Sequence, residues 1–407
     1  MSKICDVAVI GAGPYGLSLA AHLAARGIDF RVFGKPLSTW SQHMPKNMTL
    51  KSDGFASNLS APDGATSMKA WCAMKGIAYA DQALPIPLDT FLDYANAFRN
   101  RHVPMLEETN VARLSHDGGL FSLTLETGDK VLARNVVLAV GVTHFSWMPD
   151  MLAALPKDFV SHSFQHRNVD QFKGRDVTVI GAGSSAIDLA WLLHEEGANV
   201  SIVARASEVV YNKLPDAYEE TLIGRIHRPA SGIGRGWRSY FCAQAPLLFY
   251  RLPENLRLRA IESHMHPAGG FFMRDKVEGA IPQLLGRTIK AAKVCDGKVE
   301  LSVADHSGRE ETIVGDHVIA ATGYEPDMRK VPFLDEMIVK RISPAKFVTP
   351  LSDTFETRVK GLFTMGLPAM RSFGPLMRFM VGAEFAAPRV AQALEQAVGR
   401  SQLRRAA

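Results

Sequence analysis

The stretch DVAVIGAGPYG at residues 6–16 decides the fold, and the chain repeats it as DVTVIGAGSSA at residues 176–186. Each copy opens with a β-branched run, which is typical of a buried parallel strand, and then turns through Gly-Ala-Gly. An apolar segment that we expect to be helical follows each turn, and a second short apolar run comes after it, FRVF at 30–33 or VSIV at 200–203. This order of strand, glycine turn, helix and strand is typical of a dinucleotide-binding βαβ unit. The sequence therefore predicts an α/β fold with two Rossmann-like dinucleotide-binding domains, the alternative being two αβ units without a ligand.

Small residues occupy the positions where such a unit needs them. The first glycine permits the tight turn, the second lets the backbone approach a pyrophosphate, and a third small residue keeps the helix close to the strand. The helix N-terminus then faces the anion. In a chain with two such sites, the first usually holds FAD and the second a nicotinamide nucleotide. The predicted residues are Gly11, Gly13, Pro14, Tyr15 and Gly16 for FAD, and Gly181, Gly183, Ser184 and Ser185 for the nicotinamide nucleotide, with Ala186 in place of the third glycine.

The ends of the second strands indicate which nicotinamide nucleotide is bound. The position that usually carries an acidic residue holds Gly34 in the first copy and Ala204 in the second, where Arg205 follows. An acidic side chain there binds the ribose 2′-hydroxyl, whereas an arginine suits a 2′-phosphate. The second site is therefore predicted to bind NADPH, and the alternative is that Arg205 is only a solvent-facing cation.

Two further apolar strands end in small residues, NVVLAVG at 135–141 and DHVIAATGY at 316–324. Glycine at such a strand end permits close approach of the backbone to a ligand. We therefore predict that Gly141 and Gly323 lie beside FAD and that Thr322 lies beside NADPH.

With these segments in this order, the sequence resembles the class B flavoprotein monooxygenases, particularly the flavin-containing monooxygenases and the ornithine and lysine N-hydroxylases. Besides the two openings, the resemblance is carried by HMPKNMTLKS (43–52), LPIPLDTFLDYANAF (84–98), the linker at 161–175, DHVIAATGY (316–324) and GLFTMGLPAMRSFGPLMRF (361–379). Pro87 and Asp89 replace the Arg and Glu that the family carries in the second of these segments. The Baeyer–Villiger signature is not met, because Phe159 and His162 stand at the wrong spacing and no Trp follows them. This departure argues against ester-forming oxygenation.

The resemblance implies a reaction and a set of flavin-proximal residues. NADPH would reduce FAD, the reduced flavin would capture O2 as a C4a-hydroperoxide, and this oxidant would hydroxylate a small substrate, an amine or an electron-rich heteroaromatic. The cofactor carries this chemistry, while the protein orients it and excludes water. The residues implied to lie near FAD are Trp40, His43, Leu50, Ser372, Phe373 and Gly374, with Lys51 and Ser52 as candidate catalytic residues at the flavin edge. An exposed loop pair is the alternative for Lys51 and Ser52.

Composition limits the remaining functions. A formal net charge of +5 on 407 residues is too dilute to indicate nucleic-acid binding. The four cysteines are scattered without CxxC spacing, which predicts no dithiol centre and favours a reducing cytoplasm. His264 and His266 are two residues apart and have no nearby Cys partner, so no metal is predicted. No apolar stretch reaches the roughly 18 residues that a membrane span requires.

The order of the segments also predicts the domain organisation. We expect a discontinuous FAD domain, residues 1–150 and 315–400, an NADPH domain at 151–314 inserted into it, and a frayed tail at 401–407. A helical excursion at about 206–290 interrupts the NADPH domain, and residues 205–290 hold thirteen Arg and Lys against eight Asp and Glu. This excursion could cap the substrate cavity, form a homodimer contact or lie on a membrane surface. The alternatives to a monooxygenase are an FAD-dependent NADPH reductase or dehydrogenase without a redox-active disulfide, and a non-catalytic nucleotide-binding protein.

Overall fold

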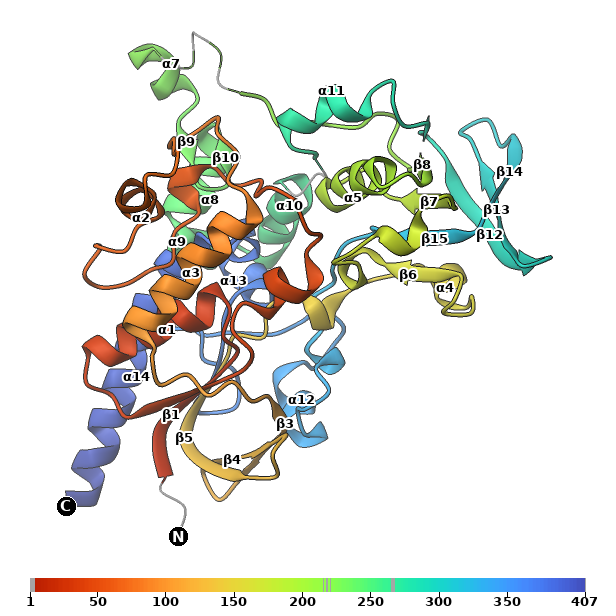
Figure 1. Ribbon diagram of the computed structural model, residues 1–407. Helices are drawn as coiled ribbons and strands as arrows, with labels where there is room; N and C mark the ends of the chain where they lie inside the picture. The colour runs from red at the N-terminus through yellow and green to blue at the C-terminus, as the bar shows by residue number, and fades with distance from the viewer. Residues whose placement is uncertain (1–3, 215, 217–218, 220, 265–267, 407) are drawn as a thin grey trace.

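The computed structural model describes residues 4–214, 216, 219, 221–264 and 268–406. Two sheets, one mixed and one entirely parallel, each built around one of the glycine-rich openings, form the centre of the molecule (Figure 1). Single turns of 3₁₀ helix lie at Gly54–Ala56, Thr143–Phe145, Ser163–Gln165, Asp170–Phe172, Phe271–Met273, Met328–Lys330, Leu367–Ala369 and Pro375–Arg378, and one π turn lies at Thr39–His43. No helix within the described ranges combines the length and apolarity needed to cross a membrane.

The first sheet has six strands. Its parallel strands are β1 (Ile4–Ile10), β2 (Phe30–Phe33), β5 (Lys130–Leu138) and β16 (Leu362–Thr364), and its antiparallel strands are β3 (Val111–Asp117) and β4 (Leu120–Leu125). β1 lies between β2 and β5, and its Val7 and Val9 are fully buried because their face of the sheet packs against α1. Next to β1, α1 (Pro14–Ala25) contacts α3 (Leu88–His102) and α14 (Gly382–Ala406), and α2 (Met68–Lys75) contacts α3.

The second sheet is entirely parallel, in the order β11-β8-β7-β15-β6. Its strands are β6 (Val160–His162), β7 (Asp176–Ile180), β8 (Asn199–Val203), β11 (Gln283–Leu284) and β15 (His317–Ala320). α5 (Ser184–Glu195) contacts β7 and β8, and α11 (Arg274–Val277) contacts α5. An antiparallel sheet at the right of Figure 1 contains β12 (Thr288–Cys295), β13 (Lys298–Ala304) and β14 (Glu310–Gly315), and β12 contacts α4 (Asp150–Ala153). The predicted α/β class with two Rossmann-like units is confirmed.

Two boundaries differ in detail from the predicted organisation. The predicted return to the first domain at residue 315 falls just before β15, and β15 pairs with β6 and β7 of the second sheet. In the structure α14 continues through Ala406, into the tail that the sequence predicted to be frayed. Residues 400–406 are Arg, Ser, Gln, Leu and Ala, which tolerate or favour a helix, and no Pro interrupts them. Residue 407 lies outside the described residues.

The excursion is mostly helical and packs on the C-terminal part of the first unit. It contains α7 (Leu222–His227), β9 (Ala230–Ser231), β10 (Gly234–Arg235), α8 (Trp237–Gln244), α9 (Pro246–Arg251) and α10 (Glu254–His264). α9 and α10 contact α13 (Met370–Phe373), where the rings of Tyr250 and Phe373 stack with centroids 5.3 Å apart. Arg257 donates a hydrogen bond to the Arg371 carbonyl at 3.0 Å. These contacts hold the excursion against α13.

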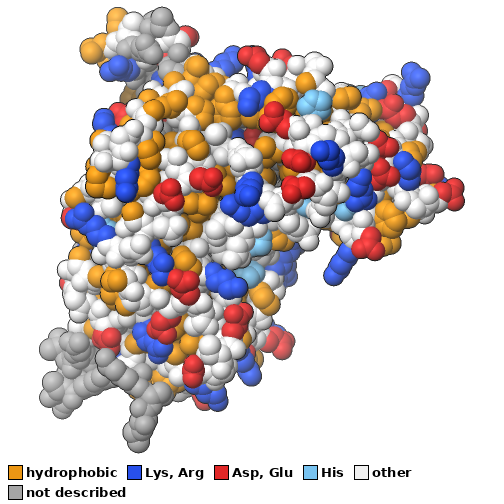
Figure 2. Space-filling view, in the orientation of Figure 1, with side chains coloured by type: hydrophobic (Ala, Val, Ile, Leu, Met, Phe, Trp, Pro, Cys, Tyr) orange, Lys and Arg blue, Asp and Glu red, His pale blue; other side chains and the backbone are white. Residues whose placement is uncertain are grey.

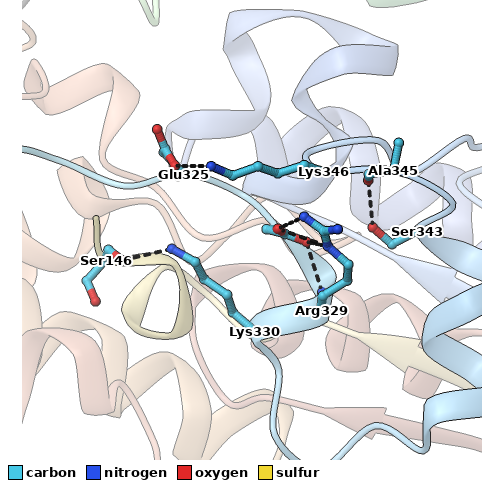
Figure 3. Close-up of polar contacts among 8 residues, drawn as sticks. Ser146, Glu325, Arg329, Lys330, Ser343, Ala345 and Lys346 are labelled. Carbon is cyan, nitrogen blue, oxygen red and sulfur yellow. Dashed lines mark hydrogen bonds and ion pairs between the residues drawn. The ribbon is translucent and has the colours of Figure 1, made fainter. Parts of the chain in front are cut away.

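The chain crosses back to the first unit after β15 and is anchored there by polar contacts (Figure 3). Lys330 Nζ donates to the Ser146 carbonyl at 3.2 Å, and Lys346 Nζ lies 3.9 Å from Glu325 Oε2. The Glu325 backbone N–H donates to the Phe145 carbonyl at 2.7 Å. The crossing segment is therefore fixed before α12 (Glu336–Ile342) begins.

Candidate active site

A cavity of about 2100 Å³ lies between the two units, and both glycine-rich openings line it. Pockets for a single small ligand usually measure about 300–1,000 Å³. This cavity therefore has room for more than one ligand.

The first opening has the backbone geometry of a pyrophosphate cradle. Gly11 has φ +118°, and a Cβ there would lie 2.2 Å from the Ala139 carbonyl oxygen. A Cβ on Gly16 would lie 1.9 Å from the Gly11 carbonyl oxygen, so the helix can approach the strand only with glycine at this position. Gly13, by contrast, has φ −87°, and a Cβ there would come no closer than 4.0 Å to Trp40. Gly13 thus leaves room at the N-terminus of α1, where backbone N–H groups attract an anion.

The second opening has the same geometry at the start of α5. Gly181 has φ +137°, and a Cβ there would lie 2.6 Å from the Ala321 carbonyl oxygen. Gly183 precedes the first turn of α5, and Ser184 and Ser185 follow it along the cavity wall. The Ser184 hydroxyl donates to the Ala268 carbonyl at 2.6 Å, so toward a ligand this oxygen is left to act as an acceptor.

Two arginines lie at the end of β8 on the cavity wall. Arg205, predicted to select NADPH, is exposed and lines the cavity. Arg287 was not predicted: its backbone N–H donates to the Ala204 carbonyl at 2.9 Å, and its guanidinium donates to Glu311 at 2.6 Å. Arg287 reaches this edge because β11 pairs in parallel with β8, and a strand of two residues leaves too weak a sequence signal to be found.

The segment predicted to lie near the flavin also lines the cavity. Trp40 and His43 lie in the π turn, and Leu50 is buried. Arg167 of the linker donates to the carbonyls of Trp40 and Met44, at 3.0 and 3.1 Å. His43 Nδ1 lies 3.1 Å from the Phe164 carbonyl. Arg167 therefore positions this segment. The sequence did not single it out, because its hydrogen-bond acceptors are backbone carbonyls, and these leave no side-chain motif to recognise.

Lys51 pairs with a buried carboxylate across the cavity. Its Nζ lies 2.6 Å from Asp188 Oδ2, donates to the Thr49 carbonyl at 2.9 Å, and stands 4.7 Å from the centroid of the Phe272 ring. Burial raises the pKa of Asp188, while the Lys51 charge acts to lower it. Asp188 is 7% exposed, and its Oδ1 has no hydrogen-bond partner among the described residues. Sequence reasoning missed Asp188, although an acid inside the apolar run IDLAWLL was an available signal.

Ser52, the other predicted catalytic residue, makes its hydrogen bond within its own loop. Ser52 lines the cavity, and its hydroxyl lies 2.8 Å from the Ser57 hydroxyl, which donates to the Asp53 carbonyl at 2.9 Å. Of the two candidate catalytic residues, Lys51 makes a contact between the two units and Ser52 does not.

The ends of the two further strands reach the same cavity. Gly141 (φ +68°), Gly323 (φ +88°) and Thr322 line it. His162 Nε2 donates to the Gly323 carbonyl at 3.2 Å, and the Thr322 hydroxyl donates to the Trp147 carbonyl. These contacts fix the strand end where the two sheets meet.

Ser372, Phe373 and Gly374, which the resemblance implied to lie near FAD, do not themselves line the cavity. Ser372 and Phe373 are buried in α13, where Phe373 stacks on Phe355 with ring centroids 3.9 Å apart. A Cβ on Gly374 would meet the Phe249 ring of α9 at 3.2 Å. This wall of the cavity is formed instead by Gly366, Leu367, Met370, Met377, Arg378, Phe379 and Met380.

No group of three or more His, Cys, Asp or Glu side chains in the described ranges is arranged to hold a metal. His264 lines the cavity, whereas His266 lies outside the described residues. The cysteines are free thiols, and burial raises the pKa of Cys5 to about 11. A protonated thiol is a poor nucleophile, so Cys5 is unsuited to dithiol exchange.

Two glycine-rich openings on one cavity define a pyridine-nucleotide oxidoreductase fold, and comparison with known families agrees. Residues 8–223 match the pyridine nucleotide-disulphide oxidoreductase family, and the chain belongs to this family. An indole-3-pyruvate monooxygenase of Oryza sativa subsp. japonica (YUCCA1) is 27% identical over 207 residues, covering 48% of this chain and 47% of that protein. The chain thus spans about half the length of such curated relatives. A ferredoxin–NADP reductase of Ignicoccus hospitalis is 22% identical over 89% of both chains.

Solved structures share the fold over nearly the whole chain. The ornithine hydroxylase of Pseudomonas aeruginosa superimposes with a TM-score of 0.73 at 16% identity, covering 97% of this chain and 99% of that one. The ornithine N-hydroxylase of Kutzneria sp. 744 gives a TM-score of 0.74 at 15% identity with the same coverage. A bacillithiol disulfide reductase of Staphylococcus aureus gives 0.64 at 18% identity, covering 97% and 98%. The resemblance to class B flavin monooxygenases inferred from sequence is confirmed at the level of fold.

Proposed function

We propose that this chain is an NADPH-dependent, FAD-containing monooxygenase that hydroxylates a small amine or an electron-rich heteroaromatic. The observation that carries the proposal is the convergence of both glycine-rich openings on one cavity. Hydride transfer requires that the nicotinamide and the flavin ring touch, and a shared cavity permits this contact. The monooxygenase names of several similar proteins support the same reaction class.

The residues present fit both cofactors. The first opening offers the N-terminus of α1 with room at Gly13, which suits the FAD pyrophosphate. The second opening offers the N-terminus of α5, with Arg205 and Arg287 at the neighbouring strand edge for a 2′-phosphate. Both helices lack an acidic residue in the first turn, so nothing there repels a phosphate.

The side chains between the openings would position the reacting groups and keep water out. Lys51 holds a positive charge between the two units, and Asp188 offers its unpaired Oδ1 to a ligand N–H. Trp40 and Met377 contribute apolar wall to the cavity. Bound FAD would supply the hydride-accepting and oxygen-transfer chemistry. In the net reaction NADPH, O2 and a proton are consumed, one oxygen atom enters the substrate and the other leaves as water.

A reductase is the second candidate, because the similarity to the ferredoxin–NADP reductase of Ignicoccus hospitalis covers 89% of the chain. A dithiol mechanism is not supported: Cys5, Cys72 and Cys242 are buried, and Cys295 lies on β12 outside the cavity wall. A reductase of this sequence would therefore pass electrons directly to an external acceptor.

Oxygen-isotope labelling separates the two candidates. The FAD-loaded enzyme is reduced with NADPH without air and then mixed with ¹⁸O2 and a panel of amines and heteroaromatics. The proposal expects one ¹⁸O atom in a product, seen as a mass increase of the label in mass spectrometry. Absence of a labelled product, together with rapid NADPH-dependent reduction of ferredoxin, would establish the reductase instead.

A further inference from the structure

α7 presents its apolar side to solvent. Leu222, Ile223 and Ile226 share one side of this six-residue helix, with exposed fractions of 79%, 62% and 59%. Gly224 is the residue of α7 that is buried. A surface helix normally turns its apolar stripe toward the core. In α7 this orientation is reversed, which exposes three large aliphatic side chains at one end of the molecule.

A second group of exposed apolar side chains lies at the start of α8. The Gly236 N–H donates to the Pro229 carbonyl at 2.9 Å, which holds the start of α8 against the segment that follows α7. Trp237 is 60% exposed, and its ring centroid lies 5.7 Å from that of Tyr240. We define the α7–α8 apolar surface as Leu222, Ile223, Ile226, Trp237, Tyr240 and Phe241. Figure 2 shows hydrophobic and basic side chains together on the projecting tip at the upper left, over α7.

Arginines accompany this surface. Residues 221–253 contain five arginines and no Asp, Glu or Lys. Arg235 is turned inward, where it donates to Gln82 at 2.8 Å and lies 3.8 Å from Glu219. The other four are exposed, and of these Arg228 pairs with Glu219 and Arg238 donates to the Ser263 hydroxyl at 3.2 Å, while Arg225 and Arg251 face solvent. The surface therefore combines aliphatic and aromatic side chains with positive charge.

We infer that the α7–α8 apolar surface docks on an anionic lipid bilayer. Leu, Ile and Trp side chains insert at the boundary between headgroups and acyl chains, and arginines bind the anionic headgroups. A second copy of this chain fits less well. In a twofold dimer the same surface supplies both sides of the interface, so two sets of arginines would come together at an energetic cost, with no acidic residue of 221–253 between them. A bilayer satisfies both the apolar side chains and the arginines at once.

Vesicle flotation tests this inference and does not depend on the proposed reaction. The full-length protein is floated with vesicles of phosphatidylcholine alone or with 30 mol% phosphatidylglycerol, at low and high salt. The wild type should bind the anionic vesicles at least tenfold more tightly, and high salt should weaken the binding. The triple variant Leu222→Ser, Ile223→Ser and Ile226→Ser should bind at least tenfold more weakly.

A matched control replaces three exposed apolar residues elsewhere: Met74→Ser, Met337→Ser and Val314→Ser, whose exposed fractions are 71%, 70% and 53%. This control should bind like the wild type. Failure of the wild type to bind anionic vesicles, or equal binding by both triple variants, would overturn the inference. Sedimentation of the wild type as a dimer that the α7 triple variant abolishes would show that a second copy covers the surface, and would overturn it too.

Discussion

Lys51 Nζ and Asp188 Oδ2 lie 2.6 Å apart, in an ion pair that joins the segment after the first dinucleotide opening to the helix that begins at the second. The side chains are 18% and 9% exposed. Two charges removed this far from water need each other, because an unpaired buried charge is costly. Because Lys51 belongs to one unit and Asp188 to the other, the ion pair helps to hold the two units on either side of the cavity.

Replacing Lys51 by Met should destabilise the fold because it leaves the Asp188 carboxylate buried without a cation. The expected loss is about 3 kcal/mol, the lower end of what is found when one partner of a buried pair is removed. Denaturant unfolding measures it. The double variant Lys51→Met/Asp188→Leu should recover most of the loss, since no charge is then left unpaired. Additive losses in the double variant would show that the two residues do not act as a pair.

Gly13→Val should remove FAD without disturbing the fold. The backbone at Gly13 has φ −87°, which any residue adopts, and the protein leaves space there, but the added side chain would occupy the place of the pyrophosphate. Flavin absorbance per chain should fall at least tenfold, while thermal unfolding should match that of flavin-stripped wild type. Gly11→Val is the contrasting variant, because its Cβ would meet a backbone oxygen at 2.2 Å, and it should lose the fold too. Retained flavin in Gly13→Val would disprove the assignment of this opening to FAD.

The two openings could be predicted because their requirements are local. A positive φ at Gly11 and Gly181 and a close helix–strand approach at Gly16 are imposed by a single βαβ unit. Asp188 could not be assigned a role in this way, because its partner Lys51 lies in a distant part of the chain and only the packing of the two units brings them together.

The C-terminal segment is a second case in which packing between distant parts of the chain decides which residues line the cavity. The resemblance located 361–379 near the cavity, and Gly366 and Met377 do line it. Which side of α13 faces the cavity depends on α9 of the excursion, whose Phe249 packs on Gly374. The excursion carries no motif from which that packing could be derived, so the sequence could not show that Phe373 packs on Phe355 or that Gly374 lies against Phe249.

Arg205→Ala should abolish the preference for NADPH over NADH. Arginine binds a phosphate through paired, charge-assisted hydrogen bonds worth about 1–3 kcal/mol, which corresponds to a change of about fivefold to about 150-fold in the ratio of kcat/KM values. Arg287→Ala should have a smaller effect, because its guanidinium also serves Glu311. Lys290→Ala removes a nearby exposed cation that does not line the cavity and should leave the ratio unchanged. Equal ratios in the wild type and Arg205→Ala would make Arg205 a solvent-facing cation only.

The last prediction concerns acid stability and a buried network of two histidines around one hydroxyl. His317 Nδ1 lies 3.1 Å from the Asp158 carbonyl and must donate to it, which makes His317 Nε2 an acceptor for the Ser161 hydroxyl at 2.7 Å. The Ser161 oxygen then accepts from His166 Nε2 at 2.6 Å, and His166 Nδ1 accepts from Gln171 at 3.4 Å. Every donor in this network has an acceptor only while both imidazoles are neutral.

Burial accordingly lowers the pKa of His166 from 6.5 to about 4, and it also lowers the pKa of His317. Between pH 6.5 and about pH 4, the unfolded chain therefore binds a proton at His166 that the folded chain does not bind. The free energy of unfolding should therefore fall as the pH drops from about 6.5 to about 4, by on the order of 2–3 kcal/mol for His166. Denaturant unfolding at several pH values measures this slope. His166→Gln can still donate to Ser161 and does not titrate, so its slope should be shallower, whereas replacement of the exposed His194 by Gln should leave the wild-type slope. Identical slopes in the wild type and His166→Gln would mean that His166 does not remain neutral in the fold.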